Sequence, residues 1–445
     1  MIDASAIAAA IGVPCLVSGD MQQKMQLWED MYENKAAWQN KRVRPMRLPA
    51  AIARELKRLT LTEFTAEVSD TELNSGFQAM VPKLRRCLDM GLSMGGLLLK
   101  PYYAGDVLVD IVPQNAYLPV NYTDCTCDGV ICPEEIAVGK TYYTRLEQHT
   151  YDRNKRTHTI RQRCFKSGMP GILGTECSLA EVPQWADILP EKVYENVQRP
   201  LFAVFQNPDA NNIDPTSPLG VSVYGDAVGF IRDADVQWER TLWELESSER
   251  AVNASADLFR YVGGKPVLPK GRERMYQIVQ TADNKPFMET FSPEIRDTAY
   301  FNSLNQMLRR IESAVGLAYG TFSEVSDVEK TAEEVRASKQ RSFVRVGDIQ
   351  ANLRTALDDL VYGMQYYRDY YANRTQEQAE LSCTFGDGVL EDADKEFQRR
   401  MQMVSAGLYS KEQFVMWYFG CDAEKASEYL PKQEDDGGLF SGSET

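Results

Sequence analysis

Two long helical patterns, separated by a short acidic segment, constrain this chain most. The first pattern runs from Glu294 to Leu317, and its apolar side chains recur at intervals of three and four residues: Phe301, Leu304, Leu308, Ile311 and Val315. This spacing predicts a helix with an apolar seam. The second pattern starts near Ser326 or Thr331 and continues to Tyr371. Because helices beyond about 40 residues are unusual in globular proteins, we expect this one to pack on more than one neighbour.

The segment between the two patterns combines glycines, small polar residues and acids. It reads GLAYGTFSEVSDVEKTAEEVRASKQRSF, and Glu324, Asp327 and Glu329 precede its first basic residue, Lys330. Acids at a helix N-terminus are stabilised by the helix dipole, and this explanation suits Glu329 and Glu334. For Glu324 and Asp327, helix capping and a role in repelling another anion both remain open.

Composition narrows the class of protein. A length of 445 residues predicts several domains, and a net charge of −15 argues against unaided binding to nucleic acid, which needs clustered lysine and arginine. The nine cysteines lack the density of a disulfide scaffold, so we expect a reduced, intracellular setting. The sequence has no uninterrupted stretch of about 18 apolar residues, so it predicts no transmembrane helix.

The rest of the sequence predicts an α+β fold. Helical patterns dominate residues 1–95, strand patterns dominate 97–164, and 166–222 are rich in loops. The N-terminal helices are expected over Met21–Asn40, over Ala50–Thr60 and from a capping box at Ser69. Thr141–Phe165 predicts a hairpin that turns at Asp152–Lys155. A helix from Val223 is followed by a small β insert over 256–293. Near the C-terminus we expect a strand, ELSCTF, and helices over Glu391–Ala406, Ser410–Phe419 and Ala423–Tyr429.

Reactive groups do not converge in the sequence, so we expect no catalytic residue, cofactor or metal site. His149 and His158 fall on the two strands of the hairpin, where half-exposed side chains are the favoured interpretation over a metal site. Cys125, Cys127 and Cys132 lack the paired spacing of a zinc site. GLSMGG (91–96) lies between a helix and a strand and predicts a helix stop with a tight turn.

Four segments follow one another in an order typical of one known family. They are GLSMGGLLLKPYYAGDVLVDIVPQNAYLP, then YYTRLEQHTYDR, then RPLFAVFQNPDANNIDPTSPLGVSVYGDA, and finally FSPEIRDTAYFNSLNQMLRRIESAVGLAYGTFSE with EKTAEEVRASKQRSF. In this order they resemble the portal proteins of tailed bacteriophages, of the long-tailed type. The resemblance covers about residues 85–370, and it depends on the whole series rather than on any single motif.

The resemblance implies a portal-like architecture with an α+β wing, long stem helices, a β-containing clip, a tunnel loop and a helical crown. By order along the chain, these parts are the wing (1–222), the first stem helix (223–255), the clip (256–293), the second stem helix (294–317), the tunnel loop (318–328), a long wing helix (329–373), the crown (374–430) and a disordered tail (431–445).

The resemblance also implies a function without enzymatic activity. Portal proteins form a homo-oligomeric ring, usually a dodecamer, at one capsid vertex of the virion, after assembly in the host cytoplasm. Double-stranded DNA passes through the ring during packaging and ejection. The implied partners are the terminase large subunit, head–tail connector or adaptor proteins, and the major capsid and scaffold proteins, with no membrane.

The resemblance assigns two sets of residues. One set is expected to line the channel: Tyr319, Gly320, Thr321, Phe322, Ser323, Glu324, Val325, Ser326 and Asp327. Carboxylates there would repel DNA phosphates, whereas lysine or arginine would bind them. The other set is the apolar seam of the second stem helix, which is expected to contact neighbouring subunits.

Two alternatives to a DNA-conducting ring follow from the same sequence. One is a structural ring or scaffold of the phage neck or baseplate that conducts no DNA. The other is a nucleic-acid enzyme such as the packaging ATPase, which requires a phosphate-binding loop. VGKT (138–141) does not provide that loop, because Glu134 stands where the motif needs glycine and a strand follows instead of a helix.

Overall fold

The computed structural model describes residues 2–123, 126–249, 251–263, 265–268, 275–279, 287–324, 332–374, 379–386, 393–419 and 425. These residues form both helices and strands in long and short segments, which confirms the α+β prediction. The chain divides into two units, Met1–Gly386 and Asp387–Thr445, and each is described by itself. Within the described residues, no helix combines the length and the apolar character needed to cross a membrane.

The first unit begins with four helices and one strand. They are α1 (Ala4–Ile11), α2 (Gly19–Tyr32), α3 (Leu48–Leu61), β1 (Thr65–Val68) and α4 (Thr71–Met94). The helix predicted to reach Asn40 ends at Tyr32, because the chain turns toward α5 (Val228–Ser247), where the Trp38 indole and the Met46 amide both donate to Asp235. The predicted start of α4 is one residue early, since Asp70 rather than Ser69 caps it.

A three-stranded antiparallel sheet follows α4 directly. Its strands are β2 (Gly96–Tyr103), β3 (Val107–Pro113) and β10 (Ala203–Gln206), in the order β10-β2-β3. The turn into β2 is at Gly95, which has a φ of +105° and caps α4, so the predicted helix stop and tight turn are confirmed. The buried Gln114 amide holds this turn by donating to the carbonyls of Met94 and Gly220, each at 2.8 Å.

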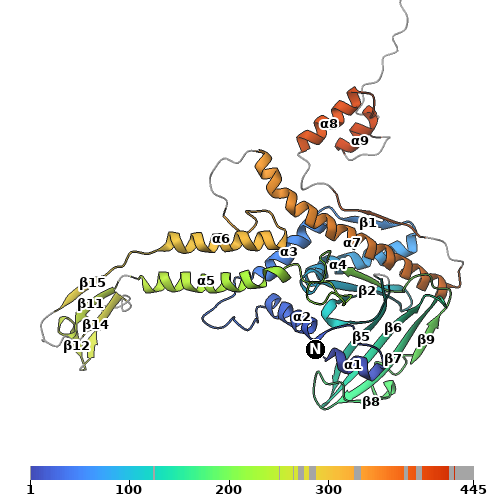
Figure 1. Ribbon diagram of the computed structural model, residues 1–445, viewed down its shortest axis with the longest axis horizontal. Helices are drawn as coiled ribbons and strands as arrows, with labels where there is room; N and C mark the ends of the chain where they lie inside the picture. The colour runs from blue at the N-terminus through green and yellow to red at the C-terminus, as the bar shows by residue number, and fades with distance from the viewer. Residues whose placement is uncertain are drawn as a thin grey trace, which may run out of the picture. The chain divides into compact units, whose positions relative to one another are not determined.

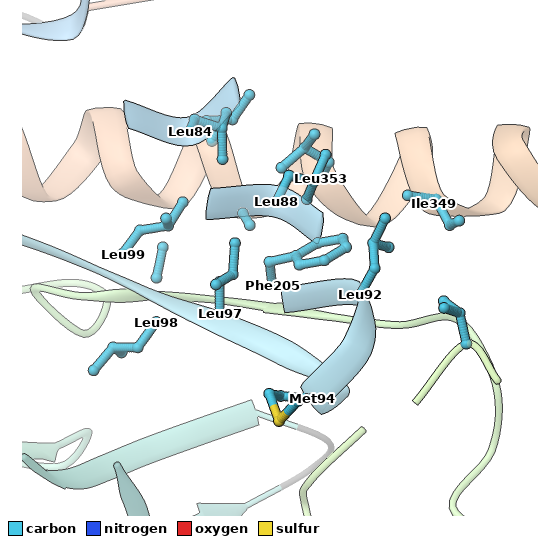
Figure 2. Close-up of a cluster of buried hydrophobic side chains, with 14 of the residues drawn as sticks. Leu84, Leu88, Leu92, Met94, Leu97, Leu98, Leu99, Phe205, Ile349 and Leu353 are labelled. Atoms are coloured by element: carbon cyan, nitrogen blue, oxygen red, sulfur yellow. The ribbon is translucent and has the colours of Figure 1, made fainter. Parts of the chain in front are cut away.

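The main core lies between α4, this sheet and α7 (Ala332–Ala372). Figure 2 shows buried side chains of these elements together: Leu84, Leu88, Leu92, Leu97, Phe205, Ile349 and Leu353. α7 has 41 residues and packs against β2, β10, α3 and α4. The prediction that this long helix has several neighbours is therefore confirmed.

A larger sheet contains the predicted hairpin. Its strands are β4 (Leu118–Thr123), β5 (Thr126–Val138), β6 (Thr141–Asp152), β7 (Thr157–Ser167) and β8 (Thr175–Cys177), paired in that order, with β9 (Glu191–Tyr194) also paired to β7. The β6–β7 turn is confirmed, and its Asp152 carboxylate accepts hydrogen bonds from the Asn154 and Lys155 amides, both at 3.0 Å. Gly139 and Lys140 form the turn between β5 and β6, so VGKT does not begin a helix.

The two histidines meet on this hairpin, but the expectation that they are half-exposed is wrong. His149 and His158 are 1% and 0% exposed, and His149 Nδ1 lies 3.1 Å from His158 Nε2. They are buried because Phe202 packs against both imidazole rings, with ring centroids 6.0 and 5.9 Å away.

Of the two cysteines that the structure describes in the CTCDGVIC segment, Cys127 is half-buried and Cys132 is buried. Burial raises the pKa of the Cys132 thiol to about 12. Cys125 lies outside the described residues. Within those residues, no three His, Cys, Asp or Glu side chains form a group that could hold a metal ion.

Helices α5 (Val228–Ser247) and α6 (Asp297–Val315) lie side by side, and the β insert separates them in sequence (Figure 1). The insert contains β11 (Ala251–Ser255), β12 (Arg260–Val262), β13 (Lys265–Val267), β14 (Tyr276–Val279) and β15 (Met288–Phe291). β11 is the central strand of the sheet β14-β11-β15, and β12 pairs with β13. The prediction placed the start of the insert at 256 and missed β11, because AVNAS lacks the apolar alternation of a strand.

Four short 3₁₀ helices also lie in the part of the first unit that the structure describes. They are η1 (Gln114–Ala116), η2 (Leu179–Glu181), η3 (Gly225–Ala227) and η4 (Ala256–Leu258). η3 immediately precedes α5, at the end of the loop-rich region that the sequence predicts over 166–222.

The C-terminal residues contribute to both units. β16 (Leu381–Thr384) pairs with β1, so the first unit includes a strand from the range 374–430 that was expected to form the crown. The second unit contains α8 (Ala393–Ser405) and α9 (Lys411–Phe419), whose Phe397 and Phe414 rings pack at 5.3 Å. The helix expected over 423–429 and the tail after 431 fall outside the described residues, apart from residue 425.

Candidate functional site

The candidate site begins where α6 ends. Gly316 caps the helix with a φ of +77°, and the Leu317 amide donates to the Glu312 carbonyl at 2.8 Å. A β-carbon at Gly316 would lie 3.1 Å from Cγ of Arg345 on α7. Glycine therefore allows both the left-handed turn and the close approach of α7.

A buried carboxylate organises the next residues. The side chain of Glu312 is 0% exposed and accepts hydrogen bonds from the amides of Gly320 (3.3 Å), Phe322 (2.6 Å) and Ser323 (2.8 Å). It also accepts one from the Ser323 hydroxyl at 2.7 Å. The loop thus folds back onto the helix that precedes it, and its amides satisfy a charge that burial alone would strongly disfavour.

Two further side chains of α6 hold the residue that follows. The Glu324 amide donates to Asn305 Oδ1 at 2.8 Å, and the Glu324 carbonyl accepts from Asn305 Nδ2 at 3.4 Å. Arg309 Nη2 donates to the same carbonyl at 3.1 Å. The backbone at Glu324 is therefore fixed beside the middle of α6, while its carboxylate is exposed.

α7 contacts the same loop from its own side. The Ala318 amide donates to Ser342 Oγ at 2.7 Å, and the Arg341 guanidinium lies 5.5 Å from the centre of the Tyr319 ring. Hydrogen bonding with Ser313 and the nearby Arg341 charge lower the pKa of the Tyr319 phenol. Both long helices thus determine the position of this loop.

The structure describes six of the nine residues that the sequence assigns to a channel, and these six differ in exposure. Ser323 is 7% exposed, and Phe322 packs against the main core, so both side chains are covered within the chain. Tyr319, Gly320 and Glu324 are exposed, and Thr321 is half-buried. Val325, Ser326 and Asp327 lie outside the described residues.

The five residues of the predicted apolar seam on α6 also differ in exposure. Leu304, Ile311 and Val315 are 6%, 0% and 1% exposed, because the core of this chain covers them, so they have little surface to offer a neighbouring subunit. Leu308 is partly buried against the same core. Of the predicted seam, Phe301 offers the largest surface, with 45% exposed.

α5 and the residues just before α6 also carry apolar surface that the seam pattern does not identify. Trp243 and Leu245 of α5 are 55% and 39% exposed, and Ile295 before α6 is 47% exposed. At the same end, Arg296 donates to both carboxylate oxygens of Glu244, at 3.0 and 2.8 Å. These hydrogen bonds lower the pKa of Glu244, so the carboxylate stays ionised and joins α6 to α5.

The β insert exposes many apolar side chains for its size. Those more than a third exposed are Leu258, Tyr261, Val262, Val267, Ile278, Met288 and Phe291. Monomeric proteins rarely leave so many apolar groups together in water, so this segment is typical of a contact surface for other chains.

A cavity of about 520 Å³ lies beside the loop. Its walls include Lys24 and Trp28 of α2 and Arg341 and Arg345 of α7. Arg345 is neutralised by an ion pair with Asp209. The described lining includes Lys24, Asp209 and Asp226 but no histidine or cysteine.

An α+β body, a helix pair with exposed apolar side chains and a loop clamped between long helices are typical of a subunit in a larger assembly. The sequence model of the family described as "Phage portal protein, SPP1 Gp6-like" matches residues 140–437, more than half of the chain. The chain therefore belongs to this family of phage portal proteins, which is a structural, non-enzymatic family located at the portal vertex of the capsid. A comparison with curated proteins gives no match.

The family match covers a different range from the resemblance seen in the sequence, about 85–370. It begins at residue 140, later than the expected 85, and continues through the C-terminal residues that resemble the family less clearly. The candidate loop and the helices α5, α6, α7, α8 and α9 all fall inside the matched range.

Proposed function

We propose that this portal protein assembles into a closed homo-oligomeric ring, a dodecamer, that conducts double-stranded DNA during packaging and ejection. The observation that carries the proposal is the loop after α6: the chain fixes its first residues to two long helices and leaves the Glu324 carboxylate exposed. A conduit needs a fixed lining that does not bind its cargo, and a carboxylate repels phosphate.

The proposal assigns the other parts by their contacts. Exposed apolar residues on α5, and Phe301 on α6, would pack against neighbouring subunits. The β insert would be the clip, whose apolar surface would meet adjacent subunits, the terminase large subunit and the head–tail connector. The body up to residue 222, with α7, would form the wing. The crown would begin after Gly386 instead of 374, because β16 belongs to the first unit.

Electron micrographs of the purified full-length chain test the ring. We expect closed rings with an open centre wide enough for duplex DNA. Filaments, a monomer at high concentration or a ring with a plugged centre would contradict the conduit and favour a scaffold component of the neck or baseplate.

Charge reversal tests the channel. Glu324→Lys, alone or with Asp327→Lys, should place a ring of cations against the DNA and reduce packaged DNA per particle about tenfold, because each phosphate contact adds binding that passage must break. Asp187→Lys is the matched control, since Asp187 is also an exposed acid but lies in the loop before β9. If both variants package the same amount of DNA, the loop does not line the channel.

A further inference from the structure

We infer that Asn305, Arg309 and Glu312 of α6 form a clamp that holds residues 320–324 of the channel loop against α6 and so positions Glu324. The inference rests on the proposed function, and it adds positioning residues that the loop sequence does not contain. We call these three residues the loop clamp.

The spacing of the loop clamp follows the helix. Its members are four and three residues apart, so they lie along one face of α6. From Glu312 to Asn305 this face extends about 10 Å at 1.5 Å per residue. Glu312 holds residues 320–323, and Asn305 with Arg309 holds residue 324, so residues 320–324 run backwards along the helix.

The two ends of the loop clamp differ in strength. Glu312 is buried, and its four hydrogen bonds involve a charged acceptor in a site shielded from water, where such bonds are strongest. The contacts between Asn305, Arg309 and Glu324 are exposed, so water competes with them. The segment up to Ser323 is therefore the firm base, and residue 324 is the first place where the loop can yield.

This arrangement couples the loop to the stem. Because the base of the loop bonds to α6 side chains over two turns, a rotation or shift of α6 must move residues 320–324 with it. The same base contacts α7 through the Ala318 amide and Ser342. A change in the tilt of the stem helices would thus change the position of Glu324, and with it the width of the channel.

Hydrogen exchange of the assembled full-length protein, without DNA, tests the clamp itself. In Glu312→Ala, we expect the peptide covering residues 319–324 to exchange about tenfold faster or more, because the Phe322 and Ser323 amides lose their acceptor and the Gly320 amide loses one of two. In Asn305→Ala, faster exchange should be confined to the Glu324 end. Gln306→Ala is the matched control, since Gln306 is an exposed neighbour on α6 and should change nothing.

The readout for positioning is DNA retention in particles at unchanged ring yield, which a purely structural role would not alter. We expect Glu312→Ala and Asn305→Ala to lower retention at least about threefold and Gln306→Ala to leave it unchanged. Unchanged exchange in Glu312→Ala would overturn the clamp whatever the DNA result, and faster exchange with normal retention would overturn its positioning role. If Glu312→Ala does not assemble, hydrogen exchange and DNA retention of Asn305→Ala test the positioning role in its place. Failure of the conduit itself is seen separately, in the micrographs and with Glu324→Lys.

Discussion

Replacing Gly95 by alanine is expected to lower the free energy of unfolding by about 3 to 5 kcal/mol, which is among the largest effects of a single methyl group. Gly95 has a φ of +105°, and a left-handed backbone costs a residue with a β-carbon about 1–2 kcal/mol. The added β-carbon would also lie 2.3 Å from the Gly220 carbonyl oxygen and 2.6 Å from Gln114 Nε2. Neither group can move freely, because they bond each other at the centre of the fold.

Gly105→Ala separates the cost of the left-handed backbone from the cost of the steric clash. Gly105 also has a positive φ, +89°, but no heavy atom lies within 4 Å of the position that an added β-carbon would take. We therefore expect only the backbone cost there, about 1–2 kcal/mol. Urea unfolding of both variants measures the difference, and equal destabilisation would show that the contact with Gly220 does not matter.

The elements predicted best are those that depend on residues close to one another in the sequence. The β6–β7 hairpin needs only an Asp152 turn between two strand patterns, and α6 needs only its apolar periodicity. The pairing of β1 with β16 joins residues more than 300 positions apart, and neither strand is longer than four residues. The ELSCTF pattern predicted β16, but the sequence indicated neither β1 nor the pairing of the two strands, because no local pattern encodes a tertiary contact.

The candidate loop shows the same limit. The acids and glycines after residue 315 identify the segment, but they do not show that its first half folds back onto α6. One signal was present: Glu312 lies four residues after Leu308 and three before Val315, inside the apolar stripe. A carboxylate in that position must be satisfied by nearby donors, and the amides of the following loop were the nearest that the chain could supply.

The second large effect is a loss of stability in acid, caused by the buried histidine pair. Each group in this hydrogen-bonded chain donates to the next, from the Leu201 amide to Glu147. The Leu201 amide donates to His158 Nδ1 at 3.4 Å, so His158 carries its proton on Nε2 and donates to His149 Nδ1. This leaves His149 Nε2 to donate to Glu147 Oε1 at 2.8 Å. Lys100 Nζ, 2.6 Å from the same oxygen, balances the Glu147 charge. Every ring nitrogen has one role, so an added proton would force two N–H groups to face each other.

The pKa values give the sign of the pH dependence. Burial, and then the nearby His149, hold the pKa of His158 well below its usual 6.5. Below pH 6.5 the unfolded chain therefore binds a proton that the folded protein does not, and stability falls by about 1.4 kcal/mol per pH unit. Burial opposes ionisation of Glu147, but hydrogen bonds from His149 and Lys100 hold its pKa well below 4.5. The stability that ionised Glu147 contributes is lost only in stronger acid. We therefore assign the loss of stability expected between pH 6.5 and 5 to His158.

We expect the free energy of unfolding of the wild-type chain to fall by about 2 kcal/mol between pH 6.5 and 5, as measured by urea unfolding. The double variant His149→Gln, His158→Gln should be less stable at pH 7 but should lose this slope, because the chain contains no other histidine. Glu191→Gln is the control, since it removes an exposed acid near the same sheet and should keep the slope. A slope that persists in the double variant would assign the acid sensitivity to another group. A flat wild-type profile would mean that water reaches the pair and that His158 titrates normally in the folded protein.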